Sequence, residues 1–283
     1  MQKFNSLLRK PFQFLHFPRL NYFSQVQRYE FLNYKQVGSV GVIQINRPTK
    51  FNALSKEVTN EINDIFLALD KEDSIGAIVL TGHKDFFASG ADILEMKDET
   101  YPDTYMKQLH AHWNNISQIK KPIIGAVSGY ALGGGCIYAL LCDIVVAGNN
   151  SKIGVPAIAL SIIPICGSTQ SLPHLVGKSR AMEIFLTGSP MSASEAQKIG
   201  LVNYVYETDK VIDEAIRIGE KISKYSKPIV KMAKECVINS FDLPLSEGLN
   251  YEKRMFWSTF AMKDQKEGMT AFIEKREAKF IDS

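Results

Sequence analysis

The sequence has 283 residues, of which 45% are apolar and 22% are charged, a composition typical of a folded globular protein with a sizeable core. The net charge of +3 is too small to indicate a nucleic-acid-binding surface, and no apolar run approaches the ~18 residues of a membrane-spanning helix. The cysteines form no C-x-x-C pair, so we expect buried, reduced thiols and no metal site. They are Cys136, Cys142, Cys166 and Cys236.

The amino terminus differs in composition from the rest of the chain. Residues 1–29 contain five basic residues, no acidic residue and many Phe and Leu residues. This composition predicts a mitochondrial transit peptide and therefore a protein of the mitochondrial matrix, with a disordered basic tail as the alternative. The remaining residues contain 28 basic and 30 acidic side chains, a net charge of −2. The positive charge thus belongs to the predicted transit peptide, which argues against nucleic acid as a partner.

Between residues 40 and 147, short β-branched runs alternate with helical patterns. Apolar residues spaced by three and four predict a helix over 55–69. We expect strands over 40–45, 77–81, 123–127 and 144–147, a second helix over 105–119, and a short helix over 133–142. Strands that alternate with helices predict an α/β fold in which most strands are buried.

The second half of the chain becomes helical. Ser192 to Glu195 form a capping box, which predicts the start of a helix, and the pattern is almost entirely helical after about residue 207. We assign residues 30–222 to an α/β core and residues 223–283 to a helical oligomerisation region. The segment 255–262 is rich in Phe and Met. It is expected to pack either on a neighbouring subunit or on its own core.

Two glycine-rich segments are the strongest functional signal. Residues 86–92 (FFASGAD) follow one predicted strand, and residues 128–136 (SGYALGGGC) follow another and lead into a helix. Small residues let another group approach the backbone, and a helix amino terminus carries amides without intrahelical acceptors. Two such turns can direct two amides at one oxygen and form an oxyanion hole. The alternative is that the glycines only permit close packing. Neither segment is a dinucleotide or P-loop motif.

Together these motifs resemble the crotonase superfamily, the enoyl-CoA hydratase/isomerase family, and most closely its mitochondrial short-chain enoyl-CoA hydratases. The resemblance extends over about residues 30–283 and implies a spiral of ββα turns with a C-terminal helical trimerisation region. It also implies a homotrimer or a dimer of trimers. The matching segments are INRPTKFNALS (45–55), GAIVLTGHKDFFASGADI (76–93), KKPIIGAVSGYALGGGCIYALLCDIVVAG (120–148), VGKSRAMEIFLTGSPMSASEAQKIGLVN (176–203) and STFAMKDQKEGMTAFIEKR (258–276).

The resemblance implies that the chain binds an acyl-CoA thioester, with no cofactor other than the coenzyme A of the ligand. The family positions assign the two oxyanion-hole amides to Ser89 and Gly134. The other implied substrate-binding residues are Ala88, Gly90, Ala91, Asp92 and Gly133 in the two loops, and Phe272 and Lys275 in the tail. Lys275 is expected to contact coenzyme A, and the alternative is that it lies on a solvated helix face.

The acid/base residues of a hydratase are absent from this pattern. Hydration of an enoyl-CoA needs two carboxylates beside one water molecule. The family positions for these carboxylates hold Ile137 and Ala157, and a family glycine position holds Ile165. Aliphatic side chains cannot transfer protons, so no catalytic residue is assigned.

Three functional hypotheses remain. The first is a catalytically degenerate crotonase with a binding or structural role in a mitochondrial assembly. The second is an active acyl-CoA enzyme, a lyase or isomerase, that uses the oxyanion hole and an unidentified base, with His83 and Tyr138 as candidates. The alternative interpretation is that His83 is a surface loop residue and Tyr138 is a core residue. The third, an RNA-binding relative, is disfavoured by the charge of residues 30–283.

Overall fold

The computed structural model describes residues 29–283. The predicted transit peptide, residues 1–29, lies outside them apart from Tyr29, so it stays a prediction. Within residues 29–283 no helix is both long and apolar enough to cross a membrane.

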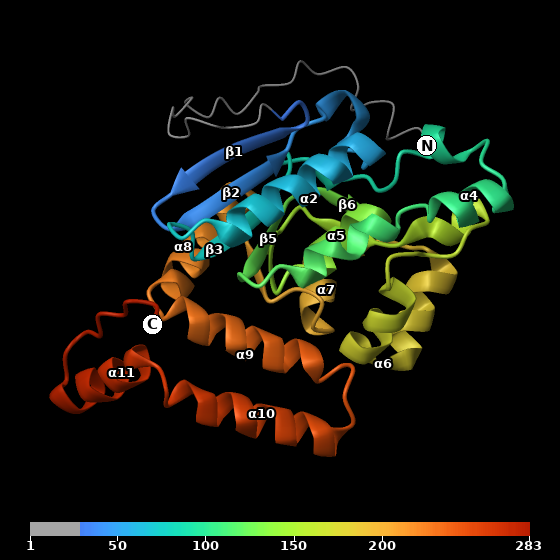
Figure 1. Cartoon of the computed structure of the whole chain (residues 1–283). Coiled ribbons are helices and arrows are strands. Elements are labelled where there is room, and N and C mark those ends of the chain that lie inside the picture. Colours follow the sequence, from blue (N-terminus) through green and yellow to red (C-terminus); the bar gives the residue numbers. More distant parts are fainter. Residues whose placement is uncertain (1–28) are drawn as a thin grey trace.

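A six-stranded sheet forms the centre of the molecule (Figure 1). The first two strands form an antiparallel hairpin, and the others continue in parallel from the second. Three of these strands have the bounds that the sequence predicts. In sheet order the strands are β1 (Leu32–Val37), β2 (Val40–Ile45), β3 (Ala77–Thr81), β5 (Ile123–Val127), β7 (Ile144–Gly148) and β10 (Tyr204–Tyr206).

A second sheet of four very short strands lies beside the first, and the sequence analysis missed it. After each of β3, β5 and β7 the chain forms one strand of this second sheet, so successive turns add a strand to both sheets. This repeated path, with helices between the turns, is the predicted ββα spiral and confirms it. The strands are β4 (Phe86–Ala88), β6 (Tyr130–Leu132), β8 (Lys152–Gly154) and β9 (Met191–Ser192).

Helices cover both faces of the six-stranded sheet. On one face α2 (Lys56–Lys71) buries seven residues and begins at Ser55, whose side chain accepts a hydrogen bond from the Val58 amide, as expected for an N-cap. On the other face α8 (Val211–Ser223) packs on the central strands. The capping box of Ser192 with Glu195 is present at the start of α7 (Ala193–Lys198), as predicted.

The predicted helix over 105–119 is wrong. Helix α4 (Tyr101–Lys107) ends early, and Gln108 and His110 adopt left-handed backbone conformations with φ of 47° and 62°. Such conformations interrupt a right-handed helix. The chain then continues as the 3₁₀ helix η2 (Ala111–Gln118). This change of direction brings Trp113 into the core, where it is 1% exposed.

Apart from the C-terminal helices, the remaining helices connect the strands or follow them. Of these, α5 leads away from the second glycine-rich segment, and η3 contains the position of Ala157. Their bounds are η1 (Pro48–Lys50), α3 (Ile93–Met96), α5 (Gly134–Leu140), η3 (Pro156–Leu160), α6 (Ser168–Thr187) and η4 (Thr208–Lys210).

Three C-terminal helices extend away from the sheets (Figure 1). They are α9 (Lys227–Asn239), α10 (Leu245–Thr259) and α11 (Lys263–Glu274). Neither α9 nor α10 has a single buried residue, although α10 carries Phe256 and Trp257, which are more than half exposed. Within this chain α9 and α10 therefore lack the apolar burial that normally stabilises helices of their length.

Candidate functional site

The structure brings the two glycine-rich segments together. Strands β4 and β6 pair in parallel, so the loops that follow them leave the same edge of the sheet. A Cβ atom added to Gly90 would lie 3.2 Å from the Gly134 amide nitrogen, and one added to Gly135 would lie 2.1 Å from the Ala88 carbonyl oxygen. The backbones touch, and no larger residue fits between them. The sequence could not predict which glycines meet, because their contact depends on the pairing of β4 with β6.

This close approach gives a sharp prediction for Gly135→Ala. The new methyl group would overlap the backbone of Ala88, which cannot move without disturbing the β4–β6 pairing, so we expect a loss of about 3 kcal/mol in the free energy of unfolding. The control is Gly248→Ala in α10, where no atom lies within 4 Å; it is expected to stabilise the protein by about 0.5–1 kcal/mol. Urea denaturation compares the two, and equal midpoints would contradict the close contact.

The two predicted oxyanion-hole amides differ in their hydrogen bonding. Gly134 is the first residue of α5, where a backbone N–H has no acceptor within the helix. The Ser89 N–H, in contrast, donates to the Phe51 carbonyl oxygen at 3.1 Å. To donate to a ligand oxygen, Ser89 must share or release this bond. Sequence reasoning could not find this interaction, since it joins two loops that are 38 positions apart.

Asp92 organises the first loop. Its carboxylate accepts a hydrogen bond from the Leu94 amide at the start of α3 and forms a 2.8 Å ion pair with Arg47. The loop is also held by the Leu54 amide, which donates to the Gly90 carbonyl oxygen at 2.8 Å. Through these contacts Asp92 supports the backbone of its loop.

The positions of the two hydratase carboxylates are aliphatic and packed. Ile137 lies on α5, is 4% exposed and belongs to the main core cluster. Ala157 lies in η3, is partly buried and packs against the same cluster. Ile165, at the family's glycine position, is exposed. No proton-transfer group therefore stands at any of these three positions.

A buried cluster of polar side chains lies next to Gly134. We define the donor cluster as His110, Trp113, Tyr138 and Cys166. The Trp113 and Tyr138 rings meet edge to face at 5.4 Å, the His110 ring lies 4.5 Å from Trp113, and the Cys166 thiol donates a weak 3.6 Å hydrogen bond to the His110 carbonyl oxygen. Burial raises the pKa of Cys166 to about 12, so this thiol stays protonated.

Trp113 belongs to none of the sequence motifs, although it is one of only two tryptophans in the chain. That scarcity was the only available signal. In the structure its indole ring lies on Gly134, since a Cβ atom added to Gly134 would approach Trp113 Cζ3 to 2.3 Å.

His83 is not brought to the loops. Its ring stacks on Phe86 at 4.6 Å and its Nδ1 lies 3.5 Å from the Asp85 carboxylate. Desolvation lowers its pKa. His83 stands before β4, whereas Ser89 follows the end of that strand. The two therefore lie at opposite ends of β4, which does not favour His83 as a base.

Phe272 and Lys275 also lie away from the loops of their own chain. Phe272 is 85% exposed on α11, and Lys275 is the C-cap residue that follows α11. Figure 1 shows α11 at the lower left edge of the molecule, away from α5 near its centre. Within this chain these residues therefore do not line the two glycine-rich segments.

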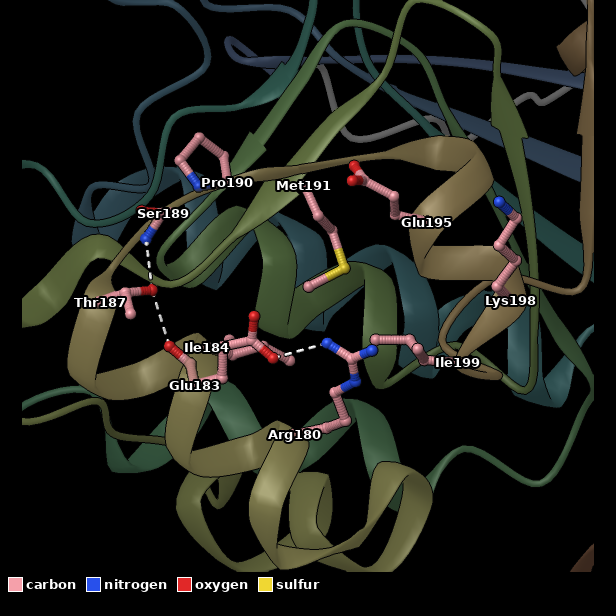
Figure 2. Close-up of a pocket in the computed structure, with 10 residues that line it drawn as sticks. All are labelled: Arg180, Glu183, Ile184, Thr187, Ser189, Pro190, Met191, Glu195, Lys198 and Ile199. Atoms are coloured by element: carbon pink, nitrogen blue, oxygen red, sulfur yellow. Dashed lines mark hydrogen bonds and ion pairs between the residues drawn. The ribbon is translucent and has the colours of Figure 1, made fainter.

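A pocket of about 290 Å³ lies between α6 and α7 and is shown in Figure 2. An ion pair of 2.6 Å joins Arg180 to Glu183 at this pocket. None of the residues in the two glycine-rich segments lines it. No group of His, Cys, Asp or Glu residues able to hold a metal occurs within residues 29–283.

The family of the chain follows from a comparison of its sequence with profiles of known families. The sequence profile described as "Enoyl-CoA hydratase/isomerase" matches residues 35–283. The chain belongs to the enoyl-CoA hydratase/isomerase family. This membership confirms the family that the sequence motifs resemble.

Individual members of the family are similar in sequence to this chain over most of their length. A "probable enoyl-CoA hydratase, mitochondrial" of Dictyostelium discoideum is 49% identical, covering 84% of this chain and 86% of the relative. An "enoyl-CoA hydratase, mitochondrial" of Pongo abelii is 47% identical, covering 86% and 84%. The crystal structure of enoyl-CoA hydratase subunit I of Geobacillus kaustophilus superimposes with a TM-score of 0.88 at 38% identity, covering 91% and 100%.

Proposed function

We propose that this family member is a mitochondrial acyl-CoA-binding protein that has lost hydratase chemistry. The adjoining glycine loops and the mitochondrial enoyl-CoA hydratase relatives support acyl-CoA binding. The observation that carries the loss of chemistry is Ile137, a buried aliphatic side chain at the family's first carboxylate position. Ala157 at the second position leaves the pair without either proton-transfer group.

The proposed binding mode uses the backbone of the two loops. The thioester carbonyl oxygen accepts hydrogen bonds from the amides of Gly134 and Ser89, the latter after release of the Phe51 carbonyl. In enzymes one such donor is worth about 3–4 kcal/mol toward a developing negative charge. Without a base or an acid beside it, this stabilisation supports binding and polarisation of the thioester but completes no proton transfer. Ala88, Gly90, Ala91, Asp92 and Gly133 are proposed to shape these loops.

The proposed assembly is a homotrimer or a dimer of trimers. Helices α9 and α10 bury no residue in the isolated chain, and large exposed apolar patches are typical of subunit interfaces. In such an assembly Phe272 and Lys275 from a neighbouring tail contribute to coenzyme A binding. We further propose that residues 1–29 direct the protein to the matrix, where it serves within a larger mitochondrial assembly.

The second candidate is an active lyase or isomerase of acyl-CoA with an unidentified base. The observation that favours it is 49% identity to a probable hydratase. The first candidate accounts better for the two aliphatic positions, since one general acid or base typically contributes 10²–10⁴-fold to rate.

Equilibrium titration with butyryl-CoA tests the binding half of the proposal. Butyryl-CoA has no double bond to hydrate, so binding is measured apart from turnover. We expect saturable binding, and a loss of at least about 10-fold in affinity for Gly90→Val, which would place a side chain against the Gly134 amide. The control is Gly248→Val, at a position with no atom within 4 Å. Absence of binding by the native protein would contradict the proposal.

A further inference from the structure

Two buried hydrogen-bond donors beside Gly134 have no acceptor in the described part of the chain. They are the hydroxyl of Tyr138 and the indole N–H of Trp113. Tyr138 is 0% and Trp113 1% exposed. A buried donor that loses water without gaining a partner is destabilising. The core therefore keeps two groups that an entering acceptor can satisfy.

These donors stand next to the proposed acyl-CoA site. Tyr138 follows Gly134 by four residues on α5, so the two lie on the same face of the helix. Helical side chains lean toward the amino terminus, which directs the Tyr138 ring along the helix toward Gly134. Trp113 packs against both residues, by its contact with the Gly134 backbone and by its edge-to-face contact with Tyr138.

The chemistry of the donor cluster restricts the acceptor. An indole N–H can only donate, and burial raises the pKa of Tyr138, so its hydroxyl keeps its proton. The Cys166 thiol is also protonated. No carboxylate is a member of the donor cluster. A buried carboxylate ligand would lose more solvation than neutral donors return, whereas a keto or hydroxyl oxygen has a much smaller cost.

We propose that Tyr138 is a specificity-determining residue, whose hydroxyl donates a hydrogen bond to an uncharged keto or hydroxyl oxygen on the acyl group of a bound acyl-CoA. Trp113 positions the Tyr138 ring by edge-to-face packing. This inference rests on the proposed function, because the acyl group must first reach Gly134. It predicts a preference for oxygenated over plain acyl chains of equal length.

The test compares acetoacetyl-CoA with butyryl-CoA by calorimetric titration of the full-length protein. The acyl groups have equal chain length and differ in one keto oxygen. We expect about 10-fold tighter binding of acetoacetyl-CoA to the native protein. Tyr138→Phe should abolish this preference and leave the affinity for butyryl-CoA unchanged. Tyr204→Phe, at a half-exposed tyrosine, is the matched control and should keep the preference.

A second readout separates this role from a structural one. If the Tyr138 hydroxyl is unpaired in the free protein, Tyr138→Phe should leave the melting temperature unchanged or raise it. A lowered melting temperature would mean that a buried water already accepts this hydrogen bond, and it would overturn the inference. Equal affinities for the two ligands, or a preference that survives in Tyr138→Phe, would also overturn it. If neither ligand binds, the proposed function itself falls.

Discussion

The double variant Ile137→Glu/Ala157→Glu is expected to hydrate crotonyl-CoA at least about 10²-fold faster than the native protein. The two substitutions supply the base for the water molecule and the acid for the α-carbon, each of which typically contributes 10²–10⁴-fold. The family fold around them is intact, and the glycine loops already meet. The measurement is the initial rate of loss of the enoyl thioester absorbance at saturating substrate.

The control for this gain is Ile137→Gln/Ala157→Gln, which has nearly the same shape but cannot exchange protons at neutral pH. Each single glutamate variant should gain less, because one carboxylate cannot serve both steps. Ile137 is buried, so a glutamate there loses solvation and its pKa is expected to rise. A double variant that folds and binds acyl-CoA yet matches the glutamine control would contradict the expectation that the fold around positions 137 and 157 can still support hydration.

Trp257→Glu is expected to dissociate the proposed trimer into monomers. Trp257 is 64% exposed in the single chain, and a tryptophan at the centre of an interface often contributes 2 kcal/mol or more. A buried glutamate in its place adds an unpaired charge. Sedimentation equilibrium should therefore give the mass of three or six chains for the native protein and of one chain for the variant.

The control for assembly is Leu67→Glu, which changes an exposed apolar residue of α2, outside the C-terminal helices, and should leave the oligomer intact. The Trp257→Glu monomer should also bind butyryl-CoA at least about 10-fold more weakly, because Phe272 and Lys275 of one chain do not reach its own loops. A native protein that is already monomeric would contradict the assembly, and a monomeric variant with full affinity would contradict the role of the tail.

The buried strands of the large sheet were predictable because their residues alone determine them. Strands β2, β3 and β5 are mostly apolar runs whose residues are all buried, and their predicted bounds are those of the structure. Strands β4, β6 and β8 have only three residues each, too few for a pattern. They exist because segments from successive turns pair with one another, and this information is not local.

The candidate site also has features that the sequence predicts and features that it does not. The glycine motifs identified the two loops, since close backbone approach requires glycine wherever the partner lies. The hydrogen bond from Ser89 to Phe51 and the packing of Trp113 on Gly134 join distant segments, so no local sequence pattern could predict them. The predicted helix over 105–119 failed for a local reason, since neither Gln108 nor His110 marks a left-handed turn as clearly as glycine does.

Crotonyl-CoA binding and crotonyl-CoA hydration should be measured in one sample of the purified native protein. If hydratase chemistry is lost, we expect saturable binding together with a hydration rate about 10⁴-fold or more below that of a family hydratase with both carboxylates, assayed in parallel. Hydration at a comparable rate would contradict the loss of hydratase chemistry. It would mean that a residue other than those at positions 137 and 157 performs the proton transfers.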